Sequence, residues 1–185
     1  MLIAALFSIA HFGHFLVIFQ VEHLGINVFV LFYIQGITRI IAAAITQLID
    51  QWLGIKMVTI IIQSINALAS LFIVLVQVKA ISMPDPEDQA AFSEYSIISC
   101  YFVLVLFYQA VFNSLIRVAQ SEERLFPFGK ISTVSNTSIL SGVALSLTAP
   151  LISELDHPIP MSVLSGFSAL SVILALFLPS KSQMD

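Results

Sequence analysis

The feature that most constrains this chain is a series of six apolar segments, each close to the length that crosses a lipid bilayer. They cover residues 2–21, 26–49, 56–78, 96–117, 131–153 and 161–178. A transmembrane helix needs about 20 predominantly apolar residues, and the linkers between the segments are too short for a soluble domain. The segments therefore predict an all-α membrane protein, a six transmembrane helix bundle in which residues 1–185 form a single domain.

The composition supports this prediction and excludes several classes of protein. Charged residues make up 10 % of the chain and its mean hydropathy is +1.00, whereas a soluble domain carries about a quarter charged residues. Seven Lys and Arg against eleven Asp and Glu leave no basic surface, so we expect no nucleic-acid partner. The single cysteine, Cys100, excludes an internal disulfide. The chain carries no HExxH, P-loop or Gly-x-Ser-x-Gly motif, so we expect no enzyme, no catalytic residue, no metal and no cofactor.

The basic residues of the predicted loops indicate the orientation of the chain. Six spans place both termini on one side, and that side holds Lys56, Arg117, Arg124, Lys130 and Lys181. The opposite side holds one basic residue, Lys79, together with seven acidic residues. Since Lys and Arg stay cytoplasmic, we predict a multi-pass integral membrane protein with both termini in the cytoplasm.

Arg39 is the most unusual residue in the predicted spans. It lies ten residues before the inner end of the second span. At about 1.5 Å per residue it is about 15 Å deep, near the middle of a core roughly 30 Å thick. A charge at this depth costs about 2.5 to 3.5 kcal/mol on insertion scales and needs a partner. That partner is a substrate anion, a residue outside this chain or, in a purely structural role, backbone carbonyl groups.

Polar and small residues recur at helical spacing in three of the spans. They are Gln35, Thr38, Arg39, Ala42 and Thr46 in the second span, Thr59, Gln63, Asn66, Ser70 and Gln77 in the third, and Gln109, Asn113 and Gln120 in the fourth. Such faces either line a path for a solute or form hydrogen bonds between helices. His11 and His14 share a face of the first span and have no evident third metal ligand, so they indicate hydrogen bonding in the bundle or a proton relay.

Small residues recur every four positions in the last two spans, which predicts close helix packing. They are Ser138, Gly142, Ser146 and Pro150 in the fifth span, and Ser162 and Gly166 in the sixth. Pro150 is also expected to kink its helix, because proline lacks a backbone N–H group.

The loop between the second and third spans carries a recognisable pattern. Residues 48–56 read Leu-Ile-Asp-Gln-Trp-Leu-Gly-Ile-Lys, which resembles the signature loop of the major facilitator superfamily, G-x-L-x-D-R-x-G-R-K. The matching residues are Leu48, Asp50, Gly54 and Lys56. Thr46 replaces the first Gly, Gln51 replaces the Arg, and one extra residue separates Asp50 from Gly54. The charged stretch 121–130 is similar to the one before the eleventh facilitator helix, in particular in the L-type amino-acid carrier branch.

The resemblance implies that the chain is the C-terminal six-helix half of a major-facilitator-type fold. In that fold the first and fourth helices of a half line the central cavity, the second flanks it and the third faces outward. The candidate substrate-binding residues are then Arg39, Gln35, His11, His14, Gln109 and Asn113, and the candidate gate-latch residues are Asp50 and Lys56. The polar stripe of the third span becomes a packing face.

The resemblance also implies a function. We expect a secondary transporter in the lipid bilayer that moves a small organic solute, such as an amino-acid-like molecule, by alternating access. Alternating access needs two halves that move relative to each other, and this chain is only one. We therefore expect a fragment that works with a missing N-terminal half, a partner chain or a second copy as a homodimer. The alternative is a non-transporting membrane accessory or assembly protein, whose polar stripes are interaction seams. A small oligomeric channel is the third interpretation.

Overall fold

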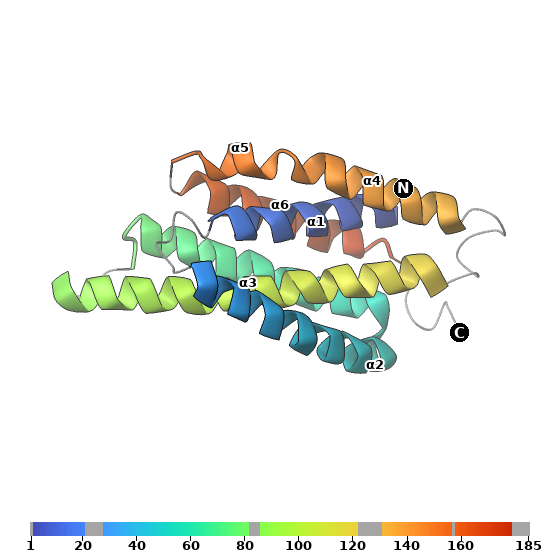
Figure 1. The fold of residues 1–185 in the computed structure, drawn as a ribbon, viewed down its shortest axis with the longest axis horizontal. Helices are drawn as coiled ribbons and strands as arrows, with labels where there is room; N and C mark the ends of the chain where they lie inside the picture. The colour runs from blue at the N-terminus through green and yellow to red at the C-terminus, as the bar shows by residue number, and fades with distance from the viewer. Residues whose placement is uncertain (1, 21–27, 82–85, 122–130, 157, 179–185) are drawn as a thin grey trace.

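The computed structural model describes residues 2–20, 28–81, 86–121, 131–156 and 158–178, and all regular secondary structure in these ranges is helical (Figure 1). The helices are α1 (Leu2–Gln20), α2 (Val28–Gln77), α3 (Pro86–Ser121), α4 (Ile131–Ser146), α5 (Ala149–Ser153) and α6 (Ile159–Ala175). They lie along a common long axis and form a bundle. The prediction of an all-α protein is confirmed.

Helix α2 consists of two helical arms that meet at Gly54, where the chain reverses its direction (Figure 1). Gly54 has φ 71° and ψ 161°, a backbone conformation essentially restricted to glycine because a side chain would clash there. Residues 28–53 are termed the first arm and residues 55–77 the second arm. The second and third predicted spans thus form a hairpin, and the loop predicted between them is a sharp turn.

Three stretches of the described helices are long and apolar enough to cross a membrane: Leu2–Gln20, Trp52–Gln77 and Ala91–Leu115. They coincide with the first, third and fourth predicted spans. The second, fifth and sixth predicted spans correspond to the shorter apolar helices Tyr33–Thr46, Ile139–Ser153 and Ile159–Ala175. The helices therefore support a membrane protein, while the full set of six spans stays a prediction.

The fifth predicted span is interrupted next to Pro150. Helix α4 ends at Ser146 and α5 begins at Ala149, with Leu147 and Thr148 in a turn between them. Proline cannot donate the hydrogen bond that would continue the helix across this point. The predicted kink is confirmed.

Helix α1 packs against α3, α4, α5 and α6, whereas α2 packs against α3 and α6. The closest approach is at Gly13 of α1, where an added Cβ would overlap the ring of Tyr108 on α3. The Tyr108 hydroxyl lies 2.5 Å from the Ser168 hydroxyl on α6, and both side chains are fully buried. Gly13, Tyr108 and Ser168 therefore join three helices at one point in the core.

The small residues predicted to pack helices have two different environments. On α4, a Cβ added at Gly142 would lie 3.1 Å from the Cβ of His11 and 3.2 Å from the ring of Phe7, so α4 rests closely on α1. On α6, Ser162 and Gly166 are exposed, and no atom lies within 4 Å of a Cβ added at Gly166. The packing prediction is confirmed at Gly142 and wrong for α6, whose buried face instead carries Met161, Leu164, Ser168, Ser171 and Ala175.

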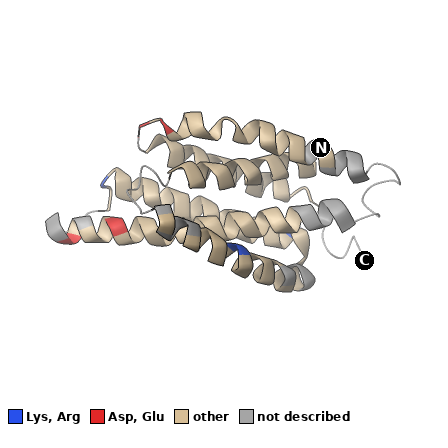
Figure 2. Cartoon of the chain, viewed as in Figure 1, with Lys and Arg blue, Asp and Glu red and all other residues tan. Residues whose placement is uncertain are grey.

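Acidic residues of the described part of the chain gather at one end of the bundle (Figure 2). They are the exposed residues Asp88, Glu94, Glu154 and Asp156. Lys79, also exposed, follows the second arm at its far end from Gly54, whereas Lys56 lies beside Gly54. Arg124, Lys130 and Lys181 lie outside the described residues, as does the side chain of Arg117. The orientation in the membrane therefore stays a prediction.

Candidate functional site

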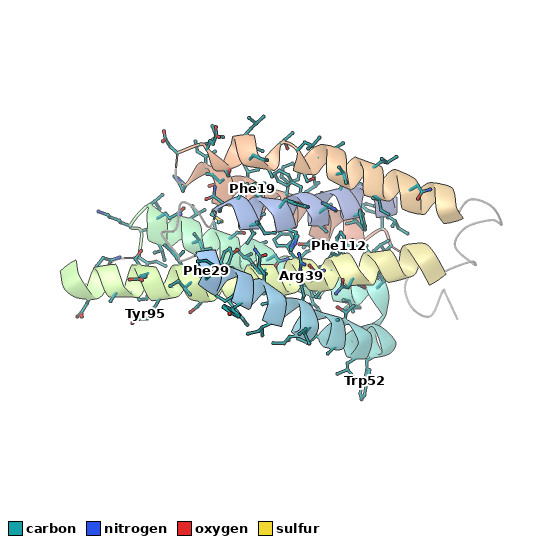
Figure 3. All side chains as sticks on the ribbon, viewed as in Figure 1. Phe19, Phe29, Arg39, Trp52, Tyr95 and Phe112 are labelled. Carbon is teal, nitrogen blue, oxygen red and sulfur yellow. The ribbon has the colours of Figure 1, made fainter. Side chains whose placement is uncertain are left out.

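Arg39 lies on the first arm of α2, about midway along the bundle (Figure 3). Its side chain is exposed, and no carboxylate of the described residues forms an ion pair with it. The apolar neighbours Ile37 and Ile40 are also exposed, at 53 % and 75 %. Arg39 thus presents a positive charge on the exposed side of the helix, where its neighbours Ile37 and Ile40 are apolar.

The two histidines of α1 lie near this arginine. The charge of Arg39 acts electrostatically on His14, and His11 lies one turn before His14 on the same helix. The Nδ1 atoms of both histidines are buried and have no hydrogen-bond partner among the described residues. The structure therefore brings Arg39 of α2 within electrostatic reach of His14 on α1.

Aromatic rings surround His11. Its ring stacks on Phe15, with centroids 5.0 Å apart and planes at 15°, and meets Phe112 of α3 edge-on at 5.3 Å and 66°. Phe7 packs against Phe112 at a centroid distance of 5.0 Å. Such stacked and edge-on contacts are favourable and fix the orientation of the ring. These phenylalanines were not among the site residues predicted from the sequence, although Phe7, His11 and Phe15 share a helix face at four-residue spacing.

Gln109 and Asn113 form a pair on α3, in which Gln109 Nε2 donates to Asn113 Oδ1 at 3.1 Å. Both side chains are partly buried. Phe112, which contacts His11, lies between them in the sequence, so the pair lies at a level close to that histidine. The pair thus belongs to the helix whose Phe112 contacts His11 on α1.

Gln35 lies one turn before Arg39 and is buried, with 8 % of its surface exposed. Its side chain interacts with the hydroxyl group of Tyr101 on α3, although neither Gln35 Nε2 nor that hydroxyl forms a hydrogen bond of ordinary geometry with a described residue. Tyr101 was not among the site residues predicted from the sequence. It lies eight residues before Gln109 and so on nearly the same face of α3, which was the available signal. These open polar atoms extend the candidate site along the bundle.

The polar stripe of the second arm lies inside the bundle. Thr59, Gln63, Asn66 and Ser70 are all 0 % exposed. Asn66 Nδ2 donates to Gln63 Oε1 at 3.3 Å, and the Ser70 hydroxyl donates to the carbonyl of Asn66 at 2.7 Å. The interpretation of this stripe as a packing face is confirmed, so it lines no path open at the surface.

Of the two gate-latch candidates, Lys56 makes a defined contact. Its Nζ atom donates to the carbonyl oxygen of Leu176 at 2.6 Å, directly after the last residue of α6. A cation at the C-terminal end of a helix is stabilised by the carbonyl groups that end there. The contact ties the beginning of the second arm to the end of α6. The side chain of Asp50 lies outside the described residues.

The candidate site therefore consists of Arg39 and Gln35 on α2, His11 and His14 on α1, and the pair Gln109 and Asn113 on α3. Among the described residues no group of three His, Cys, Asp or Glu side chains is placed to hold a metal ion. The likeness to major facilitators rests on the sequence patterns of residues 48–56 and 121–130 and on the series of six apolar segments. No protein-family model, no curated protein and no solved structure matches this chain.

Proposed function

We propose that this chain is one half of a major-facilitator-type secondary transporter, which moves a small anionic organic solute across a membrane by alternating access. The observation that carries the proposal is the exposed Arg39 within electrostatic reach of His14, with no described carboxylate paired to it. A positive charge midway along a membrane-spanning helix raises the free energy of insertion. A bound anion offsets that cost, so the arrangement favours a substrate partner for Arg39.

The surrounding side chains indicate what the solute carries besides its anionic group. A guanidinium group can form two parallel hydrogen bonds with one carboxylate. The rings of Phe15 and Phe112, which hold His11 in place, provide an apolar wall next to it, as small-molecule sites commonly do. An amino acid or a similar carboxylic acid with an apolar side chain meets both requirements.

Alternating access requires a second unit that faces this half site. The first arm of α2 presents large exposed apolar side chains, with Phe29 at 75 %, Tyr33 at 74 % and Ile40 at 75 %. In this proposal the N-terminal half, a partner chain or a second copy packs near this arm and closes the site. Lys56, held at the end of α6, and Asp50 then form the latch at one mouth.

Uptake by the complete protein that contains this chain tests the proposal. Proteoliposomes are offered a mixture of amino acids and other carboxylic acids, and the contents are analysed by mass spectrometry. Arg39→Ala is expected to reduce uptake at least about tenfold, because a hydrogen bond to a charged group is worth about 1.5–3 kcal/mol. Arg39→Lys keeps the charge but loses the planar fork, so it is expected to retain part of the uptake.

Lys79→Ala is the matched control, because it removes one positive charge from an exposed turn at the end of the bundle. We expect wild-type uptake from this variant. Wild-type uptake by Arg39→Ala, at equal abundance in the membrane, would show that Arg39 does not bind the substrate and would contradict the proposal.

The second candidate function is that of a non-transporting accessory or assembly protein of a membrane complex. The exposed apolar side chains of the first arm favour it, since they offer another membrane protein a surface to pack against. The buried stripe of the second arm does not serve as such a surface. A stable complex with another membrane protein, together with no solute uptake by that complex, would favour this function over transport.

A further inference from the structure

The interface between the second arm of α2 and α6 holds polar atoms that lack partners. They are Thr59 Oγ1, Gln63 Nε2 and Asn66 Oδ1 on the second arm, and Ser171 Oγ on α6. None of them hydrogen-bonds to a described residue, and all four side chains are 0 % exposed. Buried polar groups in folded proteins are almost always hydrogen-bonded, so several open atoms in one interface require an explanation.

Two contacts establish how the second arm and α6 are aligned. Lys56 donates to the carbonyl of Leu176, and the Ser165 hydroxyl donates to the carbonyl of Ala67 at 3.2 Å. The interval from 56 to 67 on one helix equals the interval from 165 to 176 on the other. The helices therefore run antiparallel at a constant register over this length.

This register places Ser171 opposite the turn of the second arm that runs from Thr59 to Gln63. Asn66 is bonded to Gln63 on the next turn. Neighbouring hydroxyl groups of the same interface are satisfied, because Ser168 bonds Tyr108 and Ser70 bonds carbonyl groups of its own helix. The open atoms of the second arm therefore lie on successive turns from Thr59 to Asn66, about 10 Å along the helix axis, and Ser171 lies level with the first part of that stretch.

We propose that this cluster, termed the Gln63 seam (Thr59, Gln63, Asn66 and Ser171), binds ordered water inside the bundle. The seam combines one N–H donor, one carbonyl acceptor and two hydroxyl groups that act as both. Water has two donors and two acceptors and matches this mixed set, provided that it finds two to four polar partners. Neither the second arm of α2 nor α6 carries an Asp or Glu residue to balance a cation, and the open Gln63 N–H repels one.

Removing one hydroxyl group without changing shape distinguishes a hydrated seam from a dry one. Thr59→Val deletes Oγ1 and keeps the branched side chain. If water is bound there, the variant leaves it with one partner fewer, and the melting temperature of the purified protein falls by about 2–4 °C. If the seam is dry, the variant removes a buried unpaired atom and the melting temperature stays or rises, which would overturn the proposal.

Ser70→Ala is the control, because the Ser70 hydroxyl is satisfied by the carbonyl groups of Asn66 and Ala67. Its effect on the melting temperature is expected to be smaller than that of Thr59→Val. If the two variants lose the same amount, the loss at Thr59 reports helix packing and not water.

A structure of the purified protein at a resolution that shows ordered water gives the direct test. We expect density about 2.7–3.2 Å from at least two of the four open atoms of the Gln63 seam. A seam in which these atoms bond one another and leave no room for water would overturn the proposal. Both measurements are independent of solute transport, so a failure here leaves the proposed transporter function untouched.

Discussion

The two arms of α2 carry polar stripes of similar spacing but place their most polar residues in opposite environments. On the first arm Arg39 is exposed, within electrostatic reach of His14 on α1. On the second arm, which bonds to α6 at Lys56 and Ala67, Gln63 and Asn66 are fully buried. Helical spacing therefore identifies a polar face but not its environment, since on the first arm that face is buried at Gln35, Thr38, Ala42 and Thr46 and only Arg39 is exposed.

The chemistry of the side chains explains why the two environments differ. A hydroxyl group can bond to its own helix, as Thr38 does with the carbonyl of Gln35 at 3.0 Å and Thr46 with that of Ala42 at 2.6 Å. Such residues tolerate burial. A guanidinium group has five donors and a charge, which one carbonyl of its own helix cannot satisfy. Charge thus distinguishes the exposed Arg39 from the buried hydroxyl residues of the same arm.

The largest expected effect comes from moving a guanidinium group to the packed arm. Asn66→Arg places an unpaired charge at a fully buried position, which is expected to cost about 3–5 kcal/mol. We expect loss of the monodisperse folded protein in detergent, measured by size-exclusion chromatography and by unfolding followed through the fluorescence of Trp52, the single tryptophan.

The reciprocal variant Arg39→Asn serves as its control. It removes a charge from the open arm, so we expect a folded protein with an unchanged elution volume. A folded Asn66→Arg protein would contradict the buried position of Asn66 on the second arm. An unfolded Arg39→Asn protein would contradict the exposed position of Arg39 on the first arm.

Alanine substitutions at two glycines compare the packed core with the exposed side of the first arm. Their expected effects on stability are smaller than that of Asn66→Arg. Gly13→Ala forces a methyl group into the ring of Tyr108 and is expected to destabilise the protein by about 1–3 kcal/mol. Gly36→Ala on the first arm meets no atom within 4 Å and is expected to be neutral or to stabilise by up to about 1 kcal/mol. Denaturant unfolding of the two purified variants measures the difference, and equal stability would contradict the packing described.

The turn that separates the arms has its own conformational requirement. Gly54→Ala keeps the sequence pattern around it but places a Cβ at φ 71°, with an expected cost of about 1–3 kcal/mol. Thermal unfolding of this variant beside Gly36→Ala tests it. If both glycines tolerate alanine equally, the sharp reversal of α2 at Gly54 is wrong.

Much of this fold could be predicted from the sequence, because an apolar run of about 20 residues has few alternatives to a helix. The break near Pro150 also followed from residue chemistry, and the turn at Gly54 lies in the loop predicted between the second and third spans. The buried face of α6 did not, because four-residue spacing shows that Ser162 and Gly166 share a face but not which face meets a neighbour. Tyr101 was missed for a related reason, since an aromatic residue in an apolar helix is usually a packing residue.

The smallest expected effect concerns the end of the packed arm. Lys56→Gln removes the cation that donates to the carbonyl of Leu176, with an expected loss of about 0.3–1 kcal/mol. Hydrogen exchange at the last turn of α6 is expected to become faster, while exchange at the centre of α6 stays unchanged. Unaltered exchange at that turn would show that the contact contributes nothing to the end of α6.

The most direct test of the central claim is the reactivity of single cysteines on the two arms. In a Cys100→Ala background, which removes the single native cysteine, Arg39→Cys and Gln63→Cys are treated with a charged thiol reagent that does not cross membranes. We expect position 39 to react at least about tenfold faster, because it lies in an open polar site, and position 63 to stay unmodified in the folded protein. Equal rates at the two positions, or an unreactive position 39, would contradict the account.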